Sequence, residues 1–173
     1  MGGQERRQLA PRLATLHARR TTIGQGGSVT LRVDLLEESF DLVVVRGDDL
    51  TEEFYRGVFA RAPQLRDLFA GVSMSLQKLK FLSTLVILRM SLRDIEAVMP
   101  ALEALGARHV GYGALPEHYP IIWAALLDAM EAVGGQRWTP AYSAAWGELY
   151  ALVEEAMLRG AAATEAGTGV ERA

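Results

Sequence analysis

The histidines are the residues of this chain best suited to bind a metal or move a proton near neutral pH. They are His17, His109 and His118. His17 lies in an Arg-rich leading segment, and His118 follows Glu117 at an expected helix start, as a solvated surface residue would. Apolar residues precede His109 on one helical face at Val98, Leu102 and Leu105. His109 is therefore the histidine with a candidate chemical role.

An imidazole at the end of an apolar stripe has two interpretations. It is a hydrogen-bonded, neutral core residue, which is the commoner case, or it is a ligand. No carboxylate or second histidine lies at a chelating offset from His109, which argues against zinc. A single imidazole can still hold a metal whose other ligands come from a macrocycle, and that group is haem.

The composition bounds the remaining chemistry. The 173 residues include no cysteine, which excludes disulfides, iron–sulfur clusters, thiolate zinc sites and thioether-linked cofactors. The length fits one domain with a sizeable core. A net charge of −3 argues against a dedicated nucleic-acid binder. Apolar runs fall short of the roughly 20 residues that span a bilayer. We expect a cytoplasmic protein that binds neither nucleic acid nor membrane.

The two ends of the chain differ from its middle. Residues 1–28 carry five arginines against one glutamate and finish in a Gly-rich stretch. This pattern predicts a flexible basic arm, with a transit peptide as the less favoured alternative. Residues 161–173 are expected to form a flexible tail. The folded domain is predicted to span residues 29–160.

The pattern within 29–160 is helical throughout. Apolar residues recur at helical spacing, and Gly and Pro separate the segments. A second helix could be capped by Asp48 or Thr51. Six or seven helices are predicted near 35–47, 48–62, 63–69, 73–91, 94–111, 116–135 and 139–160. The valines at 43–45 could form a strand, but no second strand-like run exists to pair with them. The predicted fold class is all-α.

Several motifs occur in a particular order along these helices. They read FYRGVF at 54–59, APQLRDLF at 62–69, QKLKF at 77–81, LGARHVGYG at 105–113 and PEHYP at 116–120. The last helix adds Trp138, Trp146, Tyr150 and Met157. Over about residues 30–160 the chain resembles a globin, specifically a bacterial single-domain haemoglobin similar to the globin domain of flavohaemoglobins and to neuroglobin. The resemblance implies a globin fold around a haem pocket.

The resemblance assigns roles on both faces of a haem. It implies that His109 ligates the iron from the proximal side and that its other ring nitrogen donates to a carbonyl of its own helix. On the distal side it implies Tyr55 and Gln77 as hydrogen-bond donors to bound O2. Phe69 would wedge the haem. Because the chain lacks cysteine, the cofactor would be haem b, held non-covalently.

Further residues are assigned by the same resemblance. Lys80 would pair with a haem propionate, or be a plain surface lysine. Leu105 and Tyr112 would pack against the haem near His109. Tyr119 would support the proximal histidine, although Ala163 stands where the glutamate partner of that tyrosine is expected.

Two residues depart from the family pattern. Phe81 replaces a smaller side chain, and its ring should shrink or gate the ligand space and could push Gln77 outward. Trp123 also replaces a small residue and would plug an apolar tunnel or fill core. Because the distal residue is Gln rather than His, five-coordinate ferrous iron is expected.

Three functions follow from this interpretation. The first is reversible binding of O2, and by the same site NO, CO or sulfide, as in oxygen transport. The second is enzymatic: a nitric oxide dioxygenase acting in nitric oxide detoxification, or a weak peroxidase. No Gly-rich dinucleotide turn is present, so a dioxygenase would need a separate reductase. The third is a haem-free interaction or sensor module. A homodimer is compatible with the sequence.

Overall fold

The computed structural model describes residues 20–22 and 30–170. In this part of the chain there are six α-helices, three short 3-10 helices and two strands. The α-helices are α1 (Val33–Val44), α2 (Gly47–Arg61), α3 (Met74–Met90), α4 (Met99–Gly111), α5 (His118–Gly134) and α6 (Pro140–Val170). The other elements are β1 (Arg20–Thr22), β2 (Thr30–Arg32), η1 (Pro63–Phe69), η2 (Leu92–Val98) and η3 (Gly135–Arg137). The predicted all-α class is confirmed. His17 lies outside the described residues, as does most of the predicted arm.

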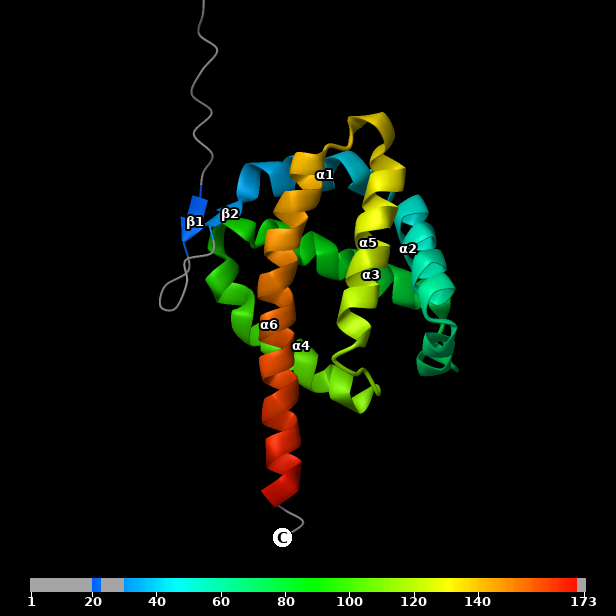
Figure 1. Ribbon diagram of the computed structural model, residues 1–173, viewed down its shortest axis with the longest axis vertical. Coiled ribbons are helices and arrows are strands. Elements are labelled where there is room, and N and C mark those ends of the chain that lie inside the picture. Colours follow the sequence, from blue (N-terminus) through cyan, green and yellow to red (C-terminus); the bar gives the residue numbers. More distant parts are fainter. Residues whose placement is uncertain (1–19, 23–29, 171–173) are drawn as a thin grey trace, which may run out of the picture.

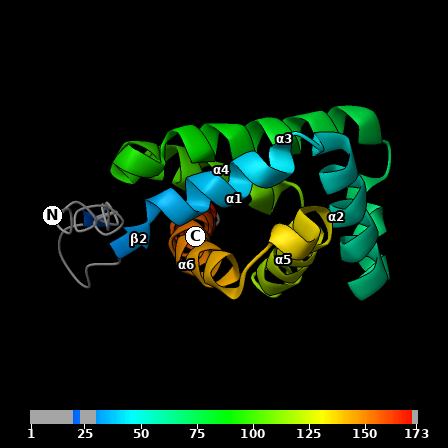
Figure 2. The same ribbon diagram turned by 90° about the horizontal axis from the view of Figure 1, so that it is seen from above.

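The helices pack mainly in two pairs. α2 packs against α5, and α4 packs against α6. Figure 1 shows α6 as the longest helix, with α5 running beside it and α3 and α4 behind them. From above, α3 lies along one edge of the molecule, and α1 lies nearer the viewer and at an angle to it (Figure 2). This arrangement leaves one long side of α3 without a covering helix.

The core between α1 and α6 includes a buried polar contact. Trp146 Nε1 donates a hydrogen bond to Ser39 Oγ at 2.8 Å. Ser39 Oγ in turn donates to the backbone oxygen of Leu35 at 2.6 Å. Because both polar groups have partners, burying them carries no unpaired-donor cost. The contact fixes the first helix of the domain on the last one.

Two glycines allow α4 and α6 to touch through their backbones. A Cβ atom on Gly106 would lie 1.9 Å from the oxygen of Met157, and one on Gly160 would lie 1.8 Å from the oxygen of Glu103. Only glycine permits an approach this close. The sequence-based prediction that the last helix ends near Gly160 was wrong, because α6 continues to Val170. Gly160 serves as a contact residue rather than as a stop signal.

Other local predictions also needed correction. Residues 20–22, which were assigned to the basic arm, form β1 and pair antiparallel with β2. The helix expected from Asp94 begins only at Met99, since Asp94 has φ −141° and ψ 59° and interrupts the helical path. α2 begins at Gly47 with no side-chain cap from Asp48 or Thr51. Val43 and Val44 are helical, as the missing partner strand indicated.

None of the described helices alone is both long and apolar enough to cross a bilayer. Only η1 and α3 taken together meet the requirement by length and composition, and they are bent by 97° relative to each other. The apolar composition of α3 is the basis of this result.

Candidate functional site

The distal side of the candidate site is a cluster of aromatic rings from α2, η1 and α3. Tyr55 is 5% exposed and lies in the middle of this cluster. Its ring meets that of Phe69 edge-on at 5.8 Å and that of Phe54 at 4.8 Å. Phe59 also meets Phe69 edge-on, at 5.5 Å. Edge-to-face packing of this kind stabilises each ring orientation, so Tyr55 has little freedom to turn.

The side chains of Tyr55 and Gln77 lie close enough to interact. Burial, the larger effect, raises the pKa of Tyr55, and the bond to Gln77 lowers it. A hydrogen bond lowers a phenol pKa when it is donated to the phenol oxygen. An amide N–H of Gln77 aimed at the phenol oxygen has this effect, and it would leave the hydroxyl proton of Tyr55 able to donate elsewhere. The two predicted distal residues are brought together by the fold.

Phe81 lies beside this pair without displacing it. Its ring stacks on that of Phe54 at 4.0 Å with 7° between the planes and meets Tyr55 edge-on at 6.0 Å. The large ring expected to crowd the ligand space thus belongs to the distal wall. Gln77 lies near Tyr55, and the expected effect of the Phe81 ring on this amide stays a prediction.

The proximal residue, His109, lies near the end of α4 and is half-buried. Its Nδ1 atom is 2.8 Å from the backbone oxygen of Leu105, one helical turn earlier. A carbonyl oxygen can only accept, so Nδ1 carries a proton, and Nε2 is the ring nitrogen left to bind a metal. Tyr112 meets the His109 ring edge-on at 5.7 Å. A neutral imidazole with a fixed tautomer is the form that ligates a metal.

The distal and proximal segments meet at Gly113. This residue has φ +80°, and a Cβ atom on it would lie 3.3 Å from Leu68 Cδ2. Leu68 precedes Phe69, and Gly113 lies just beyond His109 in the chain. The fold thereby brings the end of η1 to the turn that follows α4.

Large apolar side chains stay exposed around this junction. They are Leu68, Val72, Tyr112 and Leu115, with exposures of 38%, 43%, 63% and 48%. Apolar groups left in water beside a ligating imidazole and a buried donor pair suit a large, flat, mostly apolar ligand. Within the described residues no group of three His, Asp or Glu side chains could hold a metal by itself. The donor set present therefore fits a macrocycle-bound iron.

A polar cluster between α5 and α6 contains Tyr119. Burial, and secondarily the negative charge of Glu154, raise the pKa of Tyr119. Tyr150 donates a hydrogen bond to Glu154 Oε1 at 2.6 Å. Glu154 was missed by sequence reasoning, which searched for a carboxylate at position 163. Its position four residues after Tyr150, on the same helical face, was the available signal.

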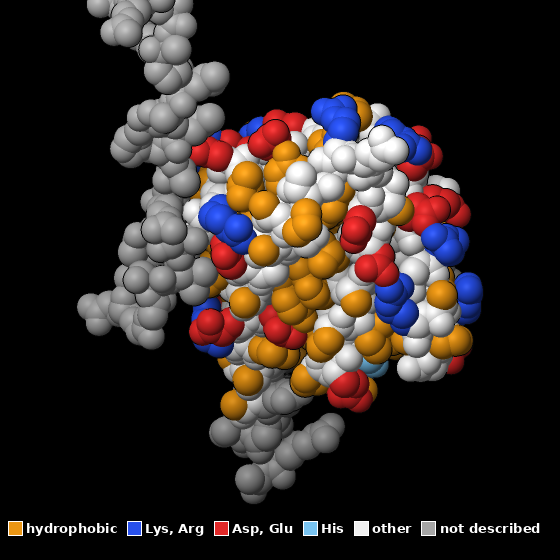
Figure 3. Space-filling view, turned by 45° about the horizontal axis from the view of Figure 1, so that its top comes forward, with side chains coloured by type: hydrophobic (Ala, Val, Ile, Leu, Met, Phe, Trp, Pro, Cys, Tyr) orange, Lys and Arg blue, Asp and Glu red, His pale blue; other side chains and the backbone are white. Residues whose placement is uncertain are grey.

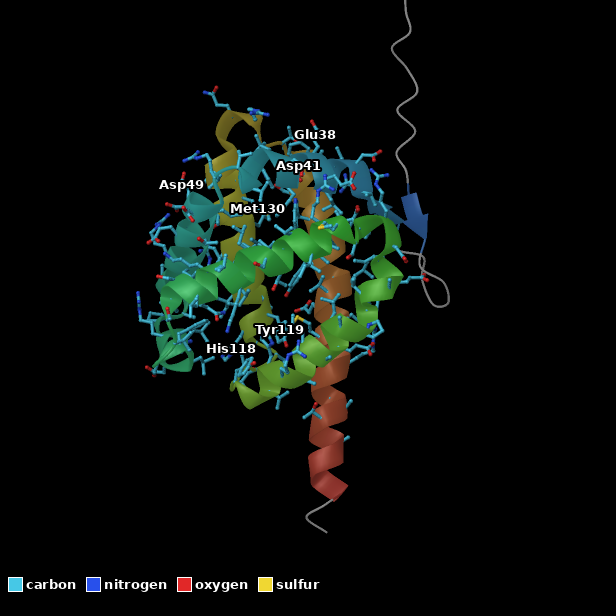
Figure 4. All side chains as sticks on the ribbon, turned by 180° about the vertical axis from the view of Figure 1, so that it is seen from behind. Glu38, Asp41, Asp49, His118, Tyr119 and Met130 are labelled. Atoms are coloured by element: carbon cyan, nitrogen blue, oxygen red, sulfur yellow. The ribbon has the colours of Figure 1, made fainter. Side chains whose placement is uncertain are left out.

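The other predicted residues lie apart from the ligand site or at its margin. Lys80 is exposed on α3, and its pairing with a propionate stays a prediction. Trp123 stacks on Tyr150 at 4.6 Å and so fills space between α5 and α6. His118 Nδ1 accepts a hydrogen bond from the backbone N–H of Leu115 at 3.0 Å. His118 lies at the start of α5 next to Tyr119 and is half-buried (Figure 4).

Comparisons with known proteins agree with this geometry. The globin family model matches residues 52–157, and the chain belongs to the globin family. It is 28% identical over 131 residues to flavohemoprotein A of Dictyostelium discoideum, covering 76% of this chain and 33% of that protein. The chain therefore spans about a third of the length of such curated relatives.

Solved structures are similar over nearly their whole length. One is an engineered carbene transferase, a variant of RmaNOD from Rhodothermus marinus, with a TM-score of 0.71 and 25% identity. The match covers 79% of this chain and 95% of that one. Another is a Pseudomonas aeruginosa protein described as structurally homologous to a human haemoglobin, with a TM-score of 0.61 and 26% identity, covering 72% and 97%. Membership of the globin family implies haem binding.

Proposed function

We propose that this protein binds haem b non-covalently and reversibly binds O2 and other small diatomic ligands at a five-coordinate iron. The observation that carries the proposal is the pairing of a buried Tyr55 close to Gln77 with a His109 ring whose Nδ1 is held by the oxygen of Leu105. When bound, haem would supply an iron able to take a small ligand such as O2. The resident residues then determine how tightly that ligand is held.

His109 holds the iron from the proximal side in this proposal. Its Nδ1 proton is engaged by the oxygen of Leu105, so Nε2 is the atom that binds. The same hydrogen bond orients the ring and makes the imidazole a better electron donor. Leu105 and Tyr112 contact the haem on this side, and Phe69 packs on it from the distal side.

The Tyr55 hydroxyl would donate a hydrogen bond to the bound ligand. Burial raises the pKa of this phenol above its ordinary value of 10, so the proton is present at every physiological pH. Gln77 orients the phenol oxygen by donating to it. A fixed donor aimed at partial negative charge stabilises that charge without reorganising, which slows release of O2.

A second candidate is a nitric oxide dioxygenase that works with a separate reductase. It is favoured by the similarity to flavohaemoproteins, of which this chain covers about a third. The same Tyr55 and Gln77 would hold O2 for reaction with NO, in a nitric oxide detoxification role. Stopped-flow mixing of the oxygenated protein with NO, with and without a reductase, separates turnover from a single reaction.

The direct test of the proposal is a haem titration. The wild-type protein should bind one haem with an intense Soret band, and the His109→Ala variant should lose stoichiometric binding. His118→Ala is the matched control and should bind as wild type, because His118 only accepts a bond from Leu115. A chain that takes up no haem would instead be the haem-free interaction module.

A second measurement tests the distal pair. Tyr55→Phe removes one hydrogen bond to a partly charged ligand, so O2 should dissociate roughly ten- to a hundredfold faster. The reduced variant should keep the spectrum of the wild-type protein. Unchanged release would mean that the Tyr55 hydroxyl does not reach the ligand.

A further inference from the structure

The outer side of α3 carries a row of large apolar side chains exposed to solvent. Leu76 is 58% exposed, Leu79 60%, Ile87 60% and Met90 74%. These four are nearly half of the nine exposed large apolar side chains in the described part of the protein. In Figure 4, where the molecule is seen from behind, α3 crosses in front with no helix covering it. Exposed apolar residues clustered in this way mark interaction surfaces.

The row is arranged symmetrically about Ser83. Leu76 and Leu79 precede Ser83 by seven and four residues, and Ile87 and Met90 follow it by four and seven. At 100° per residue, all five point within about 40° of one direction. We call these five residues the α3 stripe.

The α3 stripe is separate from the ligand site. Gln77 and Phe81 point about 120° and 160° away from Ser83 around the same helix. They contact Tyr55 and Phe54 on the inner side of α3. A molecule that covers the stripe would therefore be different from the ligand bound at the site.

We propose that the α3 stripe is a dimer interface that binds a second copy of this chain about a two-fold axis through Ser83. A two-fold contact must be self-complementary. Rotation about this axis lays two α3 helices antiparallel, so that Leu79 packs on the partner's Ile87 and Leu76 on the partner's Met90. Ser83 at the crossing is exposed and small, which lets the helices approach closely.

The cations of α3 permit this contact, because only Lys80 lies beside the stripe while Lys78 and Arg89 point about 140° and 120° away from Ser83. α3 carries cations and no acidic residue, a pattern that would repel a second copy if it were uncompensated. However, Lys78 pairs with Glu52, and Arg89 pairs with Asp41 at 2.8 Å. Both cations are thus neutralised within their own chain. Lys80 lies at the edge of the stripe, about 60° from Ser83, where its charge stays in water.

The available area indicates a weak dimer. The four exposed side chains by themselves offer less than the roughly 800 Å² per partner that a standard interface buries. Polar residues around the stripe, such as Ser75 and Thr84, must supply the remainder. We therefore expect association at micromolar or higher concentration rather than a permanent dimer.

The opposite face of the molecule is a poorer candidate. In Figure 3, hydrophobic side chains gather toward the middle of the face and most charged ones lie around it. Among the side chains described on α5 and α6, however, none is an exposed large apolar residue. An interface there would bury little new apolar surface, which favours the α3 stripe.

Cysteine crosslinking tests the axis itself, because the chain contains no cysteine. Ser83→Cys should form a disulfide-linked dimer under mild oxidation, since residues on the axis of closely packed helices lie within disulfide reach. Ser75→Cys is the matched control on the same helix. Its two copies would lie about 24 Å apart, so it should not crosslink. Equal crosslinking of both variants, or of neither, would refute the proposed axis.

Sedimentation velocity tests the surface. The wild-type dimer fraction should rise with concentration, and the Leu79→Glu/Ile87→Glu double variant should stay monomeric. Val45→Glu is the control, because Val45 is 80% exposed at the end of α1, outside the stripe. Circular dichroism should show all three proteins folded. A wild-type protein that is monomeric at every concentration, or that binds phosphatidylcholine vesicles through the stripe, would overturn the proposal.

Discussion

The two sides of the candidate site are held in place by different means. On the distal side, interlocking rings of α2, η1 and α3 surround Tyr55. On the proximal side, α4 is positioned by backbone contact with α6 at Gly106 and Gly160. The first arrangement depends on what side chains are present, and the second on the absence of side chains. The two sides should therefore respond differently to small changes.

The largest effect is expected on the proximal side, from Gly106→Ala. The added methyl group meets the backbone of Met157, which cannot turn aside as a side chain can. We expect a loss of about 3 kcal/mol in the free energy of unfolding, measured by urea denaturation, together with weaker haem retention.

Gly147→Ala provides the control for this prediction. Gly147 is also helical, but a Cβ atom on it would meet nothing within 4 Å. That variant should be as stable as wild type, or more stable by up to about 1 kcal/mol. Equal losses for Gly106 and Gly147 would show that close packing is not what α4 requires.

On the distal side, Phe81→Leu should have a smaller effect. The ring stacked on Phe54 is lost, but a half-buried leucine still fills part of the space. We expect a loss of about 1 kcal/mol and faster ligand entry, measured by flash photolysis of the CO complex. Slower entry would contradict the idea that this ring restricts the ligand space.

The pH dependence of stability provides a finer test of the distal cluster. An unfolded tyrosine loses its proton near pH 10, and burial raises the pKa of Tyr55 in the folded protein. Above pH 10 the unfolded state therefore binds fewer protons than the folded state, so stability falls as the pH rises. Tyr55→Phe should make this fall of the unfolding free energy with pH shallower between pH 9 and 11, measured by urea denaturation. Near pH 7 the variant and the wild-type protein should show the same pH dependence.

The smallest expected effect concerns the cluster between α5 and α6. Burial and the negative charge of Glu154 raise the pKa of Tyr119, and the same carboxylate accepts the Tyr150 hydrogen bond. Glu154→Gln removes the charge but keeps an acceptor, so the pKa of both phenols should drop slightly. Ultraviolet titration of the tyrosines measures this change. Glu155→Gln, an exposed neighbour, should leave the titration unchanged.

Much of the fold could be predicted from the sequence, because its signals are local. Helical periodicity located the helices, and Pro63 correctly marked the start of η1. The motifs around Tyr55 and Gln77 predicted that these two residues would lie together, while their facing His109 across a haem stays a prediction. The hydrogen bond from His109 to the carbonyl of Leu105 was also expected, since it joins residues one turn apart.

Several of the features that were missed depend on contacts distant in sequence. Gly160 was interpreted as a helix end because a glycine that stops a helix and one that admits a neighbouring backbone look alike in sequence. Glu154 was overlooked because its proximity to Tyr119 depends on how α5 meets α6. The pairing of β1 with β2 joins segments on either side of a Gly-rich stretch.

The crossing of α4 and α6 has a mechanical consequence. Gly106 sits over Met157 while Gly160 sits over Glu103, so each helix places a glycine against the backbone of the other. Sliding either helix by one turn would bring a side chain into a gap that admits none. The position of His109 relative to the axis of α6 is therefore fixed. A force applied to its imidazole along that axis would be transmitted to α6, the longest helix in the described part of the protein.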